Sequence, residues 1–158
     1  MPWRSELAAL VAARHGGQLG SIQDRLLDLA QRHPNIAEIH HQLAWTYDIL
    51  DRAAEALPHY EKAIALGLPP NELSGALLGL GSTLRELGVL DRSSEVLRSG
   101  QAQFPENREF DVFLALTLHA QANYGEAMKI LVTTLSETSD DVGITAYQRA
   151  LKHWVRRH

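Results

Sequence analysis

An internal repeat is the feature that most constrains how this chain of 158 residues can fold. Four columns of positions keep one register, and successive copies are separated first by 37 and then by 34 residues. The four columns are Leu43, Leu80 and Leu114; Ala44, Gly81 and Ala115; Ala56, Ser93 and Ala127; and Tyr60, Leu97 and Leu131. A fixed period of this length indicates stacked copies of one supersecondary unit, because a single copy cannot bury its apolar residues alone.

The spacing within one copy predicts two antiparallel helices. Leu43, Ala44 and Tyr47 share one face of a first helix. Ala56 and Tyr60 share one face of a second helix, and small residues recur where the two backbones must approach closely. Leucine and alanine, which favour helix, supply 45 of the 158 residues, and no stretch alternates as a half-buried strand does. We therefore expect an all-α fold.

We expect a single domain, 1–158, that contains repeats at 37–70, 74–107 and 108–140. Residues 1–36 follow nearly the same register and are interpreted as a degenerate N-terminal helix pair. Residues 141–158 are predicted as one amphipathic helix that caps the last repeat, because such a helix can cover an apolar face that would otherwise be exposed. This division predicts about nine helices.

The repeat resembles the tetratricopeptide repeat family from residue 37 to about residue 140, and the second copy carries the best match. The residues that carry the resemblance are Leu80-Gly81, Gly88 and Phe104-Pro105. The chain departs from the family pattern at two kinds of position: His40, Leu77 and Asp111 replace the signature tryptophan, and Asp51 and Ala122 replace the turn glycine in two copies. The resemblance implies a right-handed α-α superhelix of helical hairpins, whose concave side contacts a peptide of another protein.

The resemblance also implies which residues face that groove, namely one stripe along the first helix of each hairpin. These residues are His41, Trp45, Asp48, Leu78, Ser82, Arg85, Val112, Leu116 and His119. In the alternative interpretation, Trp45 and its neighbours pack against adjacent helices instead. The family's carboxylate clamp for acidic chaperone tails is not expected, because the clamp positions lack the required Lys, Arg and Asn. They hold His41, Trp45, Gly79, Glu109 and Phe113.

No catalytic, cofactor or metal site is predicted. The chain contains no cysteine, and its eight histidines form no pair spaced i, i+4. The glycine-rich stretch 75–81 lacks the Lys-Ser/Thr ending of a phosphate loop and lies in a predicted helix. A net charge of −4 disfavours general nucleic-acid binding, and no apolar run is long enough to span a bilayer.

The expected function is that of a non-catalytic, cytoplasmic interaction module that binds a peptide or helix of a partner protein in its groove. One alternative is a homodimer that uses the same apolar stripe or the Trp154 face of the last helix. A more remote alternative is a metal or small-ligand site that depends on the histidines.

Overall fold

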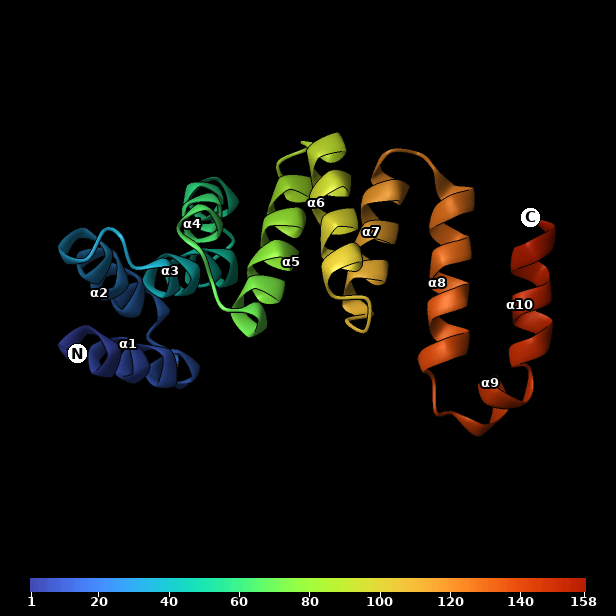
Figure 1. The fold of residues 1–158 in the computed structure, drawn as a ribbon, viewed down its shortest axis with the longest axis horizontal. Coiled ribbons are helices and arrows are strands. Elements are labelled where there is room, and N and C mark those ends of the chain that lie inside the picture. Colours follow the sequence, from blue (N-terminus) through green and yellow to red (C-terminus); the bar gives the residue numbers. More distant parts are fainter. The chain divides into compact units, whose positions relative to one another are not determined.

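The computed structural model describes residues 1–158 and consists of helices without strands (Figure 1). The helices are α1 Pro2–Ala13, the short 3-10 helix η1 Arg14–Gly16, α2 Leu19–Arg32, α3 Ala37–Ile49, α4 Ala53–Leu66, α5 Pro70–Glu86, α6 Leu90–Gln103, α7 Glu109–Ala120, α8 Tyr124–Thr138, α9 Val142–Ala146 and α10 Gln148–Arg157. The predicted all-α class is confirmed. No helix has both the length and the apolar character that crossing a membrane requires.

The chain divides into two compact units, unit 1 at residues 1–88 and unit 2 at residues 89–158. Unit 1 contains α1 to α5, and unit 2 contains α6 to α10. The repeat predicted at 74–107 is therefore shared, with its first helix in unit 1 and its second helix in unit 2.

The core of unit 1 is built from the repeat positions that the sequence predicts to face inward. Helix α3 packs against α2, α4 and α5, which places Leu43, Ala44 and Ala56 fully out of solvent. The ring of Tyr60 lies against the backbone of α5, and a Cβ at Gly79 would collide with that ring. Glycine at this position therefore permits the close approach of α4 and α5.

The turn between the two helices of each repeat keeps one conformation even where glycine is absent. Gly88 has φ +77°, and the corresponding residues Asp51 and Ala122 have φ +56° and +60°. Non-glycine residues seldom adopt this left-handed region, so the hairpin geometry holds these two residues there. The turns therefore match the repeat register at the positions where the sequence departs from glycine.

Unit 2 has its own core around α7, which packs against α6 and α8. Leu97, Phe110 and Leu114 are buried, and a Cβ at Gly100 would collide with the ring of Phe110. Helix α8 then packs against α10, and α9 lies at the end that joins these two helices (Figure 1).

The C-terminal segment differs from the prediction, because two helices replace the single helix expected at 141–158. The Asp141 carboxylate accepts a hydrogen bond from the backbone amide of Ile144 and caps α9, and the chain leaves the helical conformation at Tyr147 before α10 begins. Val142, Ile144 and Thr145 are β-branched residues with modest helix propensity, and Gly143 lies among them. The structure consequently has ten α-helices rather than about nine.

Candidate functional site

The nine residues predicted to line the groove divide between the two units. In α3 and α5 of unit 1, His41 is buried, Trp45 is 46% exposed, and Asp48, Leu78, Ser82 and Arg85 are half-buried. In α7 of unit 2, Val112 is half-buried, and Leu116 and His119 are exposed. The continuous strip across all three helices stays a prediction.

Asp48 joins three helices of unit 1. Its carboxylate accepts a hydrogen bond of 2.6 Å from the Tyr60 hydroxyl on α4 and one of 3.1 Å from the Thr83 hydroxyl on α5. Burial raises the pKa of Asp48, and the two donors partly offset that rise. Both carboxylate bonds are made within the protein, which favours a packing role for Asp48 over contact with a ligand.

His41 is buried between α3 and α5. Its Nδ1 lies 3.6 Å from a carboxylate oxygen of Glu72 and makes no hydrogen bond, and its ring stacks on Trp45 with centroids 6.3 Å apart. Burial, together with the positive charge of Arg14, lowers the pKa of His41 to about 4. The side chain is therefore neutral at pH 7.

Two other histidines of unit 1, His40 and His59, contact each other. The Nε2 of His40 donates to the carbonyl oxygen of Pro34 at 2.9 Å, so its Nδ1 accepts from the Nδ1 of His59 at 3.0 Å. Burial lowers the pKa of both rings, to about 4 for His59. No group of three or more His, Asp or Glu side chains is arranged to hold a metal ion.

One candidate site is a cavity of about 530 Å³ in unit 1, which lies along α1 and against the N-terminal halves of α3 and α5. Its apolar lining comes mainly from one face of α1, with Trp3, Leu7, Ala8, Val11 and Ala12. Its remaining lining residues are Arg4, His15, Glu38, Gln42, Pro69 and Glu72. This volume lies within the range of about 300–1,000 Å³ typical of ligand clefts.

Sequence reasoning did not identify this cavity. The degenerate first helix pair has no Leu-Ala column from which groove positions could be assigned. The available signal was the spacing of Trp3, Leu7 and Val11, which places three large apolar side chains on one face of α1.

Arg14 and Trp45 form one end of this region. The Arg14 guanidinium lies over the Trp45 ring, with its carbon 4.4 Å from the ring centroid. Its Nη1 donates to the side-chain oxygen of Gln42 at 2.9 Å and more weakly to the Thr46 hydroxyl at 3.4 Å. Gln42 lines the cavity, so the Arg14 guanidinium reaches the edge of the cavity through its bond to Gln42.

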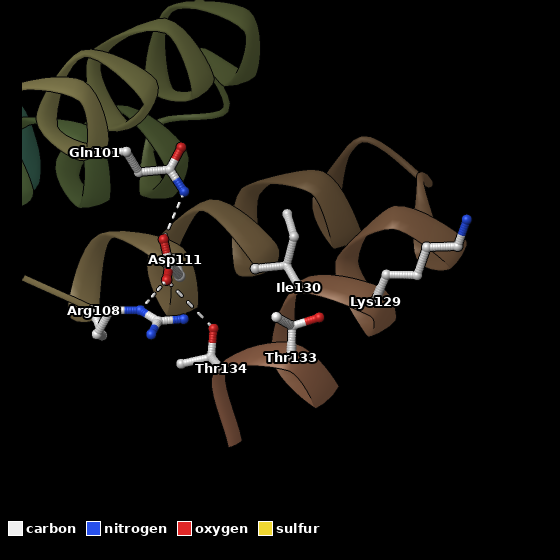
Figure 2. A pocket seen from close by; sticks show the side chains of 7 residues that line it. All are labelled: Gln101, Arg108, Asp111, Lys129, Ile130, Thr133 and Thr134. Atoms are coloured by element: carbon white, nitrogen blue, oxygen red, sulfur yellow. Dashed lines mark hydrogen bonds and ion pairs between the residues drawn. The ribbon is translucent and has the colours of Figure 1, made fainter. Parts of the chain in front are cut away.

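A smaller pocket of about 250 Å³ lies in unit 2 (Figure 2). It is centred on Asp111, whose carboxylate accepts hydrogen bonds of 2.7 Å from Gln101, 2.7 Å from Arg108 and 3.5 Å from Thr134. The bond to Asp111 raises the pKa of Arg108. The carboxylate of Asp111 is therefore already engaged within the protein, and a ligand would find no free acceptor there.

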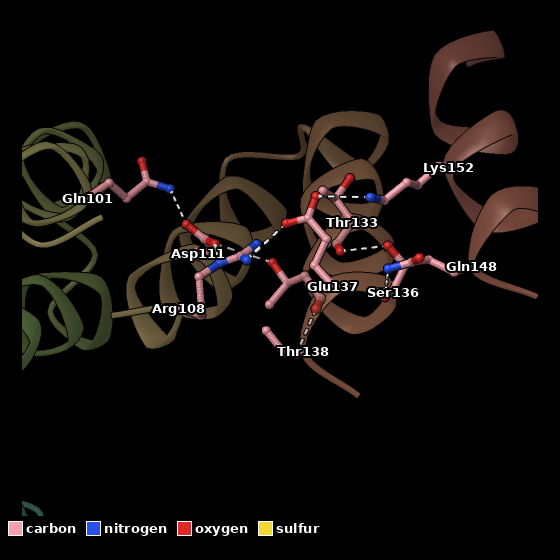
Figure 3. Close-up of polar contacts among 10 residues, drawn as sticks. Gln101, Arg108, Asp111, Thr133, Ser136, Glu137, Thr138, Gln148 and Lys152 are labelled. Atoms are coloured by element: carbon pink, nitrogen blue, oxygen red, sulfur yellow. Dashed lines mark hydrogen bonds and ion pairs between the residues drawn. The ribbon is translucent and has the colours of Figure 1, made fainter. Parts of the chain in front are cut away.

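The polar contacts around this pocket continue toward the C-terminal helix (Figure 3). Glu137 on α8 pairs with Arg108 at 2.9 Å and with Lys152 of α10 at 3.8 Å. Gln148 of α10 donates to the Ser136 carbonyl oxygen at 2.8 Å. These contacts attach α10 to α8 and identify the network as structural.

Helix α10 leaves part of α8 uncovered. Four large apolar side chains at spacings of three or four residues form an exposed stripe, which we call the α8 stripe. It consists of Tyr124, Met128, Leu131 and Leu135. A stripe of this kind is typical of surfaces that contact another protein.

The comparisons with known proteins agree on one kind of fold. A family model described as tetratrico peptide repeat matches residues 37–157. The chain is similar to the crystal structure of YrrB, described as a TPR protein with an unusual peptide-binding site, with TM-score 0.75, 16% identity and coverage of 89% of this chain and 71% of that one. It is also similar to a MamA RS-1 ArsTM double mutant, with TM-score 0.67, 17% identity and coverage of 98% and 93%. No protein with curated annotation matches the sequence.

Proposed function

Because the chain belongs to the tetratricopeptide repeat family, whose fold is a protein–protein interaction scaffold, we propose that it binds a peptide or helix of a partner protein without catalysis. The proposed groove follows the first helices of the hairpins of unit 1, α1, α3 and α5. The cavity along α1, α3 and the start of α5 carries the proposal, since it combines a ligand-sized volume with an apolar lining and a polar edge.

Two further observations support this proposal. YrrB, which shares the fold, is described as having a peptide-binding site. Trp45, a predicted groove residue, keeps nearly half of its surface exposed although Arg14 covers one face of its ring. Exposed aromatic side chains of this kind commonly supply much of the affinity at protein interfaces.

The proposal also includes a cytoplasmic location, which the absence of cysteine fits.

The test uses a display library of random peptides about twelve residues long, the length of α1. Peptides selected on the intact chain are assayed against the double variant Ala8→Glu/Ala12→Glu, in which two exposed lining residues become acidic. The matched control is Ala9→Glu/Ala13→Glu, with the same added charge at exposed α1 positions outside the cavity. We expect at least tenfold weaker binding in the first variant alone. Equal binding by both variants would contradict the proposal.

A second candidate function, self-association, is favoured by the α8 stripe. Four adjacent exposed apolar side chains could close a symmetric contact between two copies. Sedimentation velocity at increasing concentration tests this candidate with Met128→Glu/Leu135→Glu, beside Ala102→Glu as a control at an exposed α6 position. Dimers that dissociate only in the first variant would support it, and a monomer at all concentrations would exclude it.

A further inference from the structure

Arg14 is a buried cation without an acidic partner. Its side chain belongs to a residue that is only 5% exposed, yet no carboxylate lies within ion-pair distance. Its Nη1 bonds to the neutral groups of Gln42 and Thr46, and its Nε has no acceptor. Buried charges in folded proteins are normally paired, because removing them from water costs several kcal/mol.

The two other arginines that stack on aromatic rings lack this combination. Arg52 lies over Tyr47 at 5.1 Å, but it is exposed and pairs with Glu55 at 3.0 Å. Arg4 lies over Trp3 at 4.5 Å and is also exposed. Stacking on a ring therefore explains neither why Arg14 is buried nor why it has no carboxylate partner.

The surroundings of Arg14 do not compensate its charge. His41, whose low pKa keeps it neutral at pH 7, neither offsets nor adds to the positive charge of Arg14. Burial lowers the pKa of Arg14 itself, which reflects the cost of holding the cation out of water. The carboxylates that line the cavity, Glu38 and Glu72, make no ion pair with Arg14.

We propose that the groove of unit 1 recognises its partner through a glutamate or aspartate side chain that forms an ion pair with Arg14 beside Trp45. This inference rests on the proposed peptide-binding function and names the chemistry of the bound segment. The segment places apolar side chains on Leu7 and Val11 and directs its acid toward Arg14. A side chain fits this role better than a chain terminus, since only a narrow group can reach the guanidinium of a residue that is 5% exposed.

The charges on the cavity set the direction of the segment. Burial raises the pKa of Glu72, the nearby charge of Glu38 raises it further, and Arg4 partly offsets the rise. These carboxylates stand at the first turns of α3 and α5, whereas Arg14 follows the last turn of α1. Arg4 stands near Glu72 together with Glu38, so the cation at that end already has acidic neighbours, whereas Arg14 has none and can bind an acidic side chain by two hydrogen bonds.

The main experiment changes the peptide and leaves the protein intact. In each peptide selected on the wild-type chain, every Glu is replaced by Gln and every Asp by Asn, and the Kd is measured by fluorescence anisotropy. We expect one acidic position per peptide whose replacement weakens binding at least tenfold on the wild-type chain. The same replacement should have little effect on the Arg14→Gln variant, and Arg52→Gln is the control that keeps the full difference.

A second measurement does not depend on how well an Arg14 variant folds. In the wild-type chain, the Nε–H resonance of Arg14 should shift on adding an acidic peptide and shift much less with its amide analogue. Peptides that bind in the groove with no dependence on their acids would overturn this inference and leave the proposed function standing. Failure to select any peptide sensitive to Ala8→Glu/Ala12→Glu would overturn both.

Discussion

One repeat position has different surroundings in the two units. Tyr60 on α4 is 2% exposed and Leu97 on α6 is fully buried, whereas the corresponding Leu131 on α8 is 37% exposed. In unit 1, α5 packs against α4, and in unit 2, α7 packs against α6. After α8, the chain breaks into α9 and α10, and α10 packs on a different face of α8. The repeat therefore determines which face is apolar, while the next helix determines whether that face is buried.

The units also differ in how they treat buried polar groups. Unit 1 buries Arg14 and His41 without complete hydrogen bonding, near the cavity of about 530 Å³. Unit 2 surrounds Asp111 with three donors and attaches its last helix through Glu137. Incompletely paired buried groups are more often found where a ligand completes the pairing, which favours unit 1 as the binding unit.

The largest effect on stability is expected from shortening the side chain at the repeat position occupied by Tyr60, Leu97 and Leu131. Tyr60→Ala should lower the free energy of unfolding by about 4 kcal/mol, because it removes a buried ring and one of the two hydrogen-bond donors of Asp48. Leu131→Ala should cost about 1 kcal/mol or less, because its side chain already contacts solvent. Urea unfolding followed by circular dichroism measures both.

Leu97→Ala is the matched control within unit 2 and should cost about 3 kcal/mol, because Leu97 is fully buried. This variant distinguishes an effect of burial at the repeat position from a general difference in stability between the two units. If Leu131→Ala proved as costly as Leu97→Ala, the α8 stripe would be covered in solution, and the second candidate function, self-association, would gain support.

Acid should destabilise unit 1 more than unit 2. His41 has a pKa of about 4 in the folded chain against 6.5 as a reference, so the unfolded chain binds an additional proton between these values. Stability is therefore lost as the pH falls from about 6.5 to 4, by at most about 3 kcal/mol for this group. His59, with a pKa also near 4, adds to the loss, while the raised pKa values of Glu72 and Asp48 offset part of it.

Hydrogen exchange in α3 and α7, compared at pH 7 and pH 5, reports each unit separately. The histidines of unit 2 are all exposed, so α7 should change little. The variant His41→Phe should reduce the acid sensitivity of α3. Equal acid sensitivity of α3 in that variant would show that His41 does not control it.

Most of the fold could be predicted because the repeat is visible as a recurring pattern of small and large residues. The column of Ala44, Gly81 and Ala115 marks close helix contacts, and the turn positions Asp51 and Ala122 adopt the conformation expected of glycine. The family and the helical hairpins followed from these positions, and both predictions are confirmed.

The cavity and the break at Tyr147 could not be predicted in the same way. Arg14 follows α1 with no sequence signal of burial, and its position depends on Trp45, which comes 31 residues later in the chain. The break depends on local competition, since the cap at Asp141 and the β-branched run favour a short helix that the amphipathic pattern does not reveal. Tertiary contacts and cap geometry, rather than periodicity, determine these features.

A smaller effect is expected from adding one methyl group to glycines with different surroundings. Gly79→Ala should cost about 2 kcal/mol, because the Tyr60 ring that it meets is held by Asp48 and cannot easily move. Gly125→Ala on α8 meets no atom within 4 Å and should stabilise the chain by up to about 1 kcal/mol through helix propensity. Thermal unfolding of both variants compares them; a neutral Gly79→Ala would mean that α4 and α5 can separate slightly.

The smallest effect is expected where α10 meets α8. Lys152 and Arg108 both pair with Glu137, but the Lys152 distance is 3.8 Å against 2.9 Å, and Lys152 is the more exposed of the two. Lys152→Ala should therefore change the free energy of unfolding by about 0.5 kcal/mol or less and lose even that at high salt. Arg108→Ala should cost about 1–2 kcal/mol, because Asp111 also loses its charged donor. If both variants lowered the free energy of unfolding equally, the contact of α10 with α8 would be as strong as the contacts within the repeats. The difference between the two units would then consist only of the exposed α8 stripe.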